Sequence, residues 1–237
     1  MQKSMIKLLS LADIVSLTNA GFGFLAIIMA SLGEMWFSFS FILIALLADG
    51  LDGIVARKTG HSKLGDYMEA MADMISLGIA PSVFVYAIYH DAVSWCIYYH
   101  SYLFITLIVF FSLSIIRLAS FHIMKDNKFF VGLPASMSAI IIITLAFFEI
   151  EFAYILPVII IISLAMISNV HFPKPGFKID AIAAILIILT LIFGKYYYGT
   201  PLYLILGGNY YGIAPLLLIT ALVTYTILGP FYLLKSK

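Results

Sequence analysis

The sequence concentrates acidic residues in the stretch "ADGLDGIVARKTGHSKLGDYMEAMAD", which begins at Ala48 and ends at Asp73. Five of the chain's 12 acidic residues lie there: Asp49, Asp52, Asp66, Glu69 and Asp73. Paired carboxylates three or four residues apart on facing helices suit the oxygen ligation of Mg²⁺, Mn²⁺ or Ca²⁺. Arg57, in the same stretch, could hold a phosphate. These residue types together indicate metal-assisted phosphoryl chemistry.

Two other interpretations of the acids remain open from the residues alone. In one, the acids lie at helix ends and contact interfacial water or the cations Arg57, Lys58 and Lys63. In the other, they form an ion or proton pathway, as intramembrane acids do in transporters. The small residues Gly53 and Gly65 among the acids would let a large polar ligand approach the backbone, but they would equally allow close helix packing.

The composition excludes a soluble protein. Hydrophobic residues make up 63% of the chain, charged residues 11%, and the mean hydropathy is +1.10. Soluble domains contain about half apolar and about a quarter charged residues. A net charge of +1 provides no basic surface for nucleic acid.

Apolar segments long enough to cross ~30 Å of hydrocarbon predict about eight transmembrane helices. They are Asp13–Leu32, Met35–Ala56, Leu64–Tyr89, Val93–Ile123, Val131–Phe148, Phe152–Val170, Ile179–Tyr198 and Tyr211–Leu234. No strand periodicity is evident, and helices satisfy the backbone in lipid. We therefore expect an all-α membrane protein, with residues 13–237 as a single polytopic domain.

Charge placement predicts the orientation of these helices. With the N-terminus in the cytoplasm, all 13 lysines and arginines except Lys195 fall on the cytoplasmic side. The C-terminus and the acidic stretch then also lie on that side of the cell membrane. Lys3 and Lys7, among apolar residues, predict an interfacial amphipathic helix over residues 1–12. A cleaved signal peptide is the alternative there, although the segment lacks an A-x-A-like site.

The acids are expected at the cytoplasmic ends of the second and third helices. Asp49 and Asp52 are three residues apart, and Asp66, Glu69 and Asp73 follow an i, i+3, i+7 pattern. The short connection between the two helices makes them antiparallel neighbours. Both acidic faces can therefore line one crevice.

The spacing of these residues resembles the signature of the CDP-alcohol phosphotransferase family, D-x2-D-G-x2-A-R-x7/8-G-x3-D-x3-D. Seven of its eight fixed positions agree, and Glu69 replaces the third aspartate. The matching residues are Asp49, Asp52, Gly53, Ala56, Arg57, Gly65 and Asp73. The signature is highly specific, and the replacement leaves open whether Glu69 acts alone or together with Asp66.

Further segments resemble the integral-membrane phosphatidylserine synthases of bacteria and archaea. These segments are "VSLTNAGFGFLAI", "EAMADMISLGIAP", "IIRLASFH", "FVGLPAS" and "MISNVHFPKP". Leu77, Ser120 and His122 depart from the usual pattern. The resemblance extends from about Asn19 to Pro173.

The resemblance implies a serine transferase that acts on CDP-diacylglycerol, or on CDP-archaeol in an archaeon, and releases CMP. It also implies a six-helix core, catalytic over about residues 13–173, plus two further helices, and a homodimer in the membrane lipid. Two divalent ions, Mg²⁺ or Mn²⁺ with Ca²⁺ as another possible occupant, would stabilise the pyrophosphate.

The same resemblance assigns roles to individual residues. Its metal ligands are Asp49, Asp52, Glu69 and Asp73. Its general base is Asp73. Its substrate-binding residues are Gly53, Ala56, Arg57 and Gly65. We add Asn19, Asp66 and Arg117 to them; for Asn19, a hydrogen bond between helices is an equally good interpretation. Arg117 suits the serine carboxylate, because a guanidinium binds a carboxylate in bidentate fashion; a helix-end cation reaching the headgroups is the alternative.

Two rival functions remain. Another acceptor would make the protein a phosphatidylglycerophosphate or phosphatidylinositol phosphate synthase. A metal-ion transporter would also place acids in helices, but near the bilayer midplane, whereas these acids cluster at one face.

Overall fold

The structure is a computed structural model that divides the chain into two compact units, Met1–Phe84 and Val85–Lys237. It describes residues 9–59, 62, 64–93, 95–121, 129–174, 176–197 and 213–235. Within the second helix, residues 52, 54 and 56–59 are described by their backbone alone. Most of the predicted interfacial helix, residues 1–12, lies outside the described residues, and its last two residues belong to the first helix of the fold.

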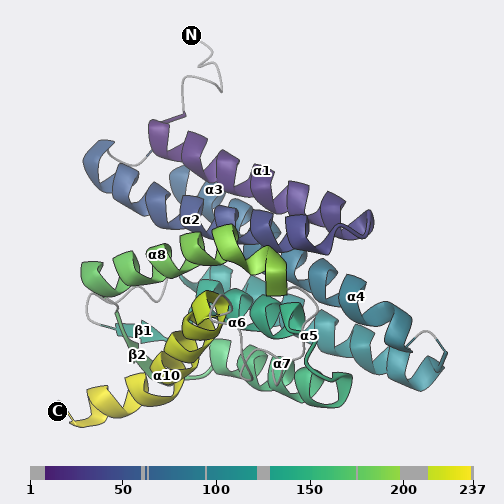
Figure 1. The fold of residues 1–237 in the computed structure, drawn as a ribbon. Helices are drawn as coiled ribbons and strands as arrows, with labels where there is room; N and C mark the ends of the chain where they lie inside the picture. The colour runs from purple at the N-terminus through teal and green to yellow at the C-terminus, as the bar shows by residue number, and fades with distance from the viewer. Residues whose placement is uncertain are drawn as a thin grey trace. The chain divides into compact units, whose positions relative to one another are not determined.

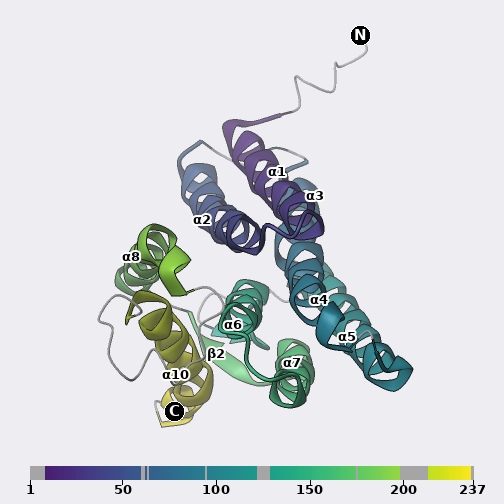
Figure 2. The same cartoon turned by 45° about the vertical axis from the view of Figure 1, so that its right-hand side comes forward.

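The first unit begins with two antiparallel helices, α1 (Leu11–Ser31) and α2 (Met35–Thr59), which lie side by side in Figures 1 and 2. A capping box starts α1: the Asp13 amide donates to Ser10 Oγ, and the Ser10 amide donates to Asp13 Oδ2. The turn after α1 depends on Gly33, whose φ of +80° lies in the left-handed region. The short turn fixes the two helices as direct neighbours.

The third segment is one helical run made of three parts. An α-helix, α3 (Gly65–Asp73), is followed by a π-helical stretch, η2 (Met74–Ile79), and then by α4 (Ala80–Val93). The amide of Ala80 donates to the carbonyl of Ile75, which is the i to i−5 bond of a π-helix. Both α1 and α2 pack against η2.

The second unit contains the end of α4 and the remaining helices, drawn from teal to yellow in Figure 1. These elements are α5 (Ile97–Phe121), α6 (Ala135–Phe147), α7 (Phe152–Met166), α8 (Phe177–Phe193), the 3₁₀ turn η3 (Gly194–Tyr197) and α10 (Ile213–Lys235). Within this unit α5 packs on α7, α6 packs on α7 and α10, and α8 packs on α10.

Each of the eight apolar segments predicted from the sequence overlaps a helix. Three helices of the described chain are long and apolar enough to cross a membrane: Leu11–Ser31, Gly65–Val93 and Ile97–Ser120. Five apolar helices are shorter: Met35–Leu51, Ala135–Phe147, Phe152–Met166, Ile179–Phe193 and Pro215–Pro230. Large apolar side chains are exposed on many of them, as expected of a protein surrounded by lipid.

The predicted fourth span, Val93–Ile123, was wrong at its start. Val93 ends α4, and α5 begins only at Ile97. The amide of Cys96 donates to the carbonyl of Val93, so the turn between the two helices follows Val93, whereas the apolar pattern had placed the break directly after Tyr89. The polar residues His90 and Asp91 suggested a break at that point, but both belong to the last turn of α4.

A small sheet was not expected from the sequence. Strand β1 (Phe129–Val131) pairs antiparallel with β2 (His171–Pro173), and Phe130 lies opposite Phe172. Strands of three residues are too short to show a period of two. The pairing ties the segment before α6 to the segment after α7.

Candidate active site

Two of the predicted site residues, Asn19 and Asp49, lie at a similar depth in the first unit. Asn19 is 12 residues before the end of α1, and Asp49 is 14 residues after the start of α2. At 1.5 Å per residue these positions lie about 18 Å and about 21 Å from the connecting turn. Asp49 is half-buried. Antiparallel packing therefore brings Asp49 to the level of Asn19.

The acids of α3 become more buried along the helix. Asp66 in the first turn is exposed, Glu69 is half-buried, and Asp73 is only 8% exposed. Asp73 ends α3 directly before the π-helical stretch. The acidic pattern of the sequence thus leads from the surface into the interior of the unit, and its last carboxylate is the one enclosed by protein.

Asn19 contacts the buried end of this series. Its side chain is fully buried, and Nδ2 donates a hydrogen bond of 2.9 Å to Oδ1 of Asp73. A hydrogen bond to an ionised carboxylate is stronger than one between neutral groups. The structure therefore joins two predicted site residues that are 54 positions apart in the chain.

Close backbone packing holds α1 against η2 near this hydrogen bond. Gly23 lies one helical turn after Asn19, and a Cβ placed on it would be 2.8 Å from Cα of Ser76. Real Cβ atoms do not approach so closely. Only glycine fits here without displacing a helix. Ser76 was not singled out by the sequence; the glycine four residues after Asn19 was the available signal.

The remaining signature residues are described only in part. Gly53 is half-buried in α2, and Gly65 begins α3. The side chains of Asp52, Ala56 and Arg57 lie outside the described residues. Their predicted roles therefore stay predictions.

Arg117 belongs to the second unit. It lies near the end of α5, is only 6% exposed, and donates from Nε to the carbonyl oxygen of Leu133 at 3.2 Å. A helix-end cation reaching for lipid headgroups would instead be exposed. Its burial argues against the headgroup interpretation, and its role in binding serine stays a prediction.

The backbone that receives Arg117 is itself held rigidly. Gly132 has a φ of +75°, and its amide donates to the carbonyl of Val170 at 2.8 Å. The next amide, that of Leu133, donates to the carbonyl of Ala165 at 3.0 Å. Pro134 then caps α6. The sequence had drawn attention to "FVGLPAS" only by resemblance and had not indicated that the Leu133 carbonyl faces Arg117.

The donor set of the first unit fits a hard divalent cation. Asp49, Glu69 and Asp73 offer carboxylate oxygens, the ligands preferred by Mg²⁺ and Mn²⁺. The fully buried Oδ1 of Asn19 has no hydrogen-bond partner among the described residues. No group of three or more His, Cys, Asp and Glu side chains comes close enough to hold a metal within the described part of the chain. The side chain of Asp52 is not in that part.

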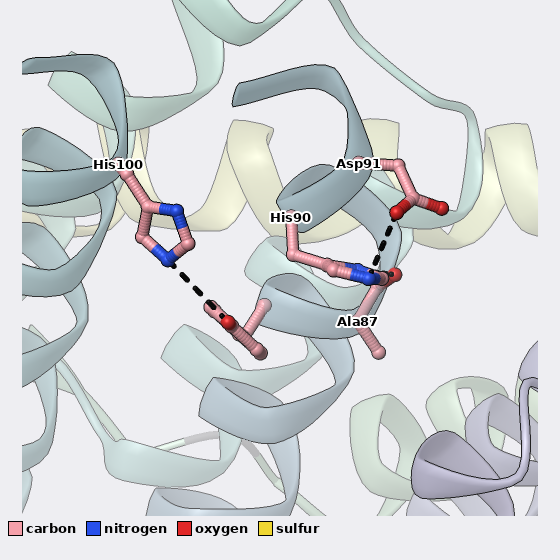
Figure 3. A network of polar contacts seen from close by, with 5 residues as sticks. Ala87, His90, Asp91 and His100 are labelled. Atoms are coloured by element: carbon pink, nitrogen blue, oxygen red, sulfur yellow. Dashed lines mark hydrogen bonds and ion pairs between the residues drawn. The ribbon is translucent and has the colours of Figure 1, made fainter. Parts of the chain in front are cut away.

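Two histidines near the α4–α5 turn have other partners (Figure 3). His90 Nδ1 lies 3.1 Å from the carbonyl of Ala87, and its Nε2 lies 2.9 Å from Asp91 Oδ1. His100 Nε2 lies 3.4 Å from the hydroxyl of Tyr86. The His90 contacts lie within α4, and the contact between Tyr86 and His100 joins α4 to α5.

Comparison with known proteins identifies the family. The family model described as CDP-alcohol phosphatidyltransferase matches residues 9–228. The chain therefore belongs to this family, as the signature in α2 and α3 predicted. The match covers both units of the structure.

Individual relatives share more than two thirds of their length with the chain. The archaetidylserine synthase of Methanothermobacter thermautotrophicus is 33% identical over 180 residues, covering 73% of each chain. The CDP-diacylglycerol–serine O-phosphatidyltransferase of Methanocaldococcus jannaschii is 32% identical over 179 residues, covering 74% of this chain and 80% of the relative. The enzyme of that name from Helicobacter pylori is 27% identical over 191 residues, covering 72% and 76%.

Proposed function

We propose that this protein transfers the phosphatidyl or archaetidyl group of a CDP-activated lipid to the hydroxyl of L-serine and releases CMP. The observation that carries the proposal is the buried Asp73 carboxylate, held by Asn19 at the end of the signature helix. The family match and the names of the relatives support it. CDP-diacylglycerol or CDP-archaeol is the lipid donor.

Asp73 is the proposed general base. It accepts the proton of the serine hydroxyl while the serine oxygen forms a bond to the lipid-bearing phosphorus. The bond from that phosphorus to the oxygen of the CMP group breaks, and CMP leaves with the electron pair. Burial of Asp73 keeps bulk water away from this proton transfer.

Four carboxylates are the proposed ligands for two divalent ions, Mg²⁺ or Mn²⁺, with Ca²⁺ as another occupant: Asp49, Asp52, Glu69 and Asp73. When bound, such ions neutralise the pyrophosphate. Use of divalent metals is general in this family. Glu69 is favoured over Asp66 as the third ligand, because Glu69 is half-buried whereas Asp66 is exposed.

The substrates are assigned to the remaining signature residues and to Arg117. Gly53, Ala56 and Gly65 leave room for the nucleotide, Arg57 binds its phosphates, and Asp66, which is exposed in the first turn of α3, contributes to substrate binding. Arg117 reads the serine carboxylate: its Nε is fixed by the carbonyl of Leu133, so the terminal nitrogens are oriented as one fork. Binding of the carboxylate by Arg117 makes the site selective for serine over the phosphorylated acceptors of related synthases.

The membrane arrangement is also proposed. About eight helices span the bilayer, six of them forming the core, and the protein is a homodimer in the lipid. Both termini and the acidic site face the cytoplasm, because the lysines and arginines lie almost entirely on that side.

Release of CMP tests the function directly. The purified protein in detergent or nanodiscs is incubated with a CDP-lipid and Mn²⁺ or Mg²⁺, with serine, glycerol 3-phosphate or inositol phosphate as acceptor. We expect CMP release only when serine is the acceptor, and no CMP release after the metal is chelated. CMP release with another acceptor would show that this acceptor, and not serine, is the substrate. Uptake of metal into sealed vesicles without CMP release would indicate a transporter.

A further inference from the structure

Asn19 presents two different groups in the interior of the first unit. Its Nδ2 donates to Asp73 Oδ1 at 2.9 Å. Its Oδ1 is buried and has no hydrogen-bond partner among the residues that the structure describes. A buried acceptor without a donor is rare in folded proteins and calls for a specific reason.

A purely structural role does not account for both groups. If Asn19 only joined α1 to α3, its oxygen would face a donor from a neighbouring helix. Ser76 and Ser16, the buried hydroxyls of η2 and α1, donate instead to the carbonyls of Ala72 and Ala12 in their own helices. The amide oxygen is thus left for a donor that is not part of the described protein.

We infer that Asn19 is a positioning residue: its nitrogen orients the Asp73 carboxylate, and its oxygen accepts a hydrogen bond from an N–H or O–H group of a bound substrate. This rests on the proposed function, in which Asp73 takes the proton of serine. The donor comes either from the nucleotide half of the CDP-lipid or from serine. In both cases the Asn19 amide contacts the bound substrate through its oxygen and Asp73 through its nitrogen.

The packing around Asn19 makes this role effective. Gly23, one turn later in α1, brings the helix into backbone contact with Ser76, three residues after Asp73. An amide carried by a helix in such contact has little freedom to move. A bound substrate that engages the oxygen therefore fixes the nitrogen, and with it the plane of the carboxylate.

Steady-state kinetics test the two groups separately. Asn19→Asp keeps an acceptor oxygen but replaces the donor, whereas Asn19→Ala removes both. Each variant should lower kcat on the order of 10- to 100-fold. Only N19A should also raise the KM of one substrate. The KM for the CDP-lipid should rise if the nucleotide supplies the donor, and the KM for serine should rise if serine supplies it. An N19A variant with both KM values unchanged would refute the role of the oxygen.

A double-mutant cycle tests the coupling to Asp73 without relying on turnover. The Mn²⁺ affinity, measured by electron paramagnetic resonance, is compared in wild type, N19A, Asp73→Ala and the double variant. We expect N19A to weaken Mn²⁺ binding in the wild type and to have no further effect once Asp73 is absent. Equal effects in both backgrounds would overturn the inference. If D73A alone leaves the affinity unchanged, the proposed metal role of Asp73 fails, and an unchanged kcat in N19A would then refute positioning.

Ser38→Ala provides a matched control. Ser38 is also fully buried, and its Oγ also has no hydrogen-bond partner among the described residues, but it lies in the first turn of α2, 11 residues before Asp49. This variant should change neither kcat, KM nor Mn²⁺ affinity. Thermal unfolding and elution as a single species are the checks that each variant is folded.

Discussion

Adding one methyl group to α1 at Gly23 should disturb both stability and catalysis. Gly23→Ala places Cβ 2.8 Å from Cα of Ser76 and 3.0 Å from its amide nitrogen. An ordinary contact begins at 3.4 Å, so the helices must separate by about 0.6 Å. Gly21→Ala is the control, because nothing lies within 4 Å of a Cβ at that exposed position of the same helix.

The comparison of these two variants isolates the steric clash. Both gain the same helix propensity, which favours alanine by up to about 1 kcal/mol. The difference in unfolding free energy is therefore the overpacking cost of ~1–3 kcal/mol, equivalent to a thermal midpoint lower by about 2–12 °C in G23A. Thermal unfolding in detergent measures this difference.

The displacement of α1 from η2 in G23A should also disturb the proposed active site. Separation of about 0.6 Å would stretch the 2.9 Å hydrogen bond from Asn19 to Asp73 beyond good geometry. We expect CMP release by G23A to fall by roughly tenfold relative to G21A. Equal midpoints and equal turnover in the two variants would refute the close contact between α1 and η2.

Four further predictions concern single substitutions. Asp73→Asn should abolish CMP release, because the proposed base is lost while the size of the side chain is kept. The CDP-lipid should still bind to this variant in calorimetry, and turnover near the wild-type rate would contradict the role of Asp73 as base. Arg117→Lys removes Nε and the fork, so the KM for serine should rise by about tenfold or more with the KM for the CDP-lipid unchanged; unchanged constants would leave only a packing role. Gly132→Ala should lower stability by roughly 3 kcal/mol or more, since φ is +75° and the new Cβ meets a carbonyl oxygen, and a wild-type thermal midpoint would disprove this strain. Glu69→Gln should reduce turnover more than Asp66→Asn, because Glu69 is the more buried carboxylate; the reverse order would make Asp66 the ligand.

Helix positions and the family could be predicted from the sequence because both depend on local patterns. Apolar length located the eight helical segments, and the spacing from Asp49 to Asp73 predicted the family that the family model confirms. Both signals are carried by neighbouring residues. Neither requires knowledge of how distant helices pack.

Features that depend on contacts between distant segments could not be predicted. The π-helical stretch after Asp73 reflects a single shift of hydrogen bonds within an apolar run, which leaves hydropathy unchanged. The bond from Asn19 to Asp73 depends on the depth at which α1 meets α3. The sequence had placed Asn19 at the site, but helix-to-helix bonding and substrate binding were equally compatible with it.

In each unit a polar residue of the proposed site lies near a glycine that packs closely against the backbone of another segment. In the first unit Gly23 lies against Ser76, one turn from the Asn19 amide that holds Asp73. In the second unit Gly132 lies against the carbonyl of Met166, next to the residue whose carbonyl accepts from Arg117. Interhelical hydrogen bonds in a membrane contribute only ~0.6 kcal/mol on average, too little to fix a side chain alone. The glycine contacts supply the missing rigidity, so substitutions at these two glycines should affect turnover even though neither residue can touch a substrate through a side chain.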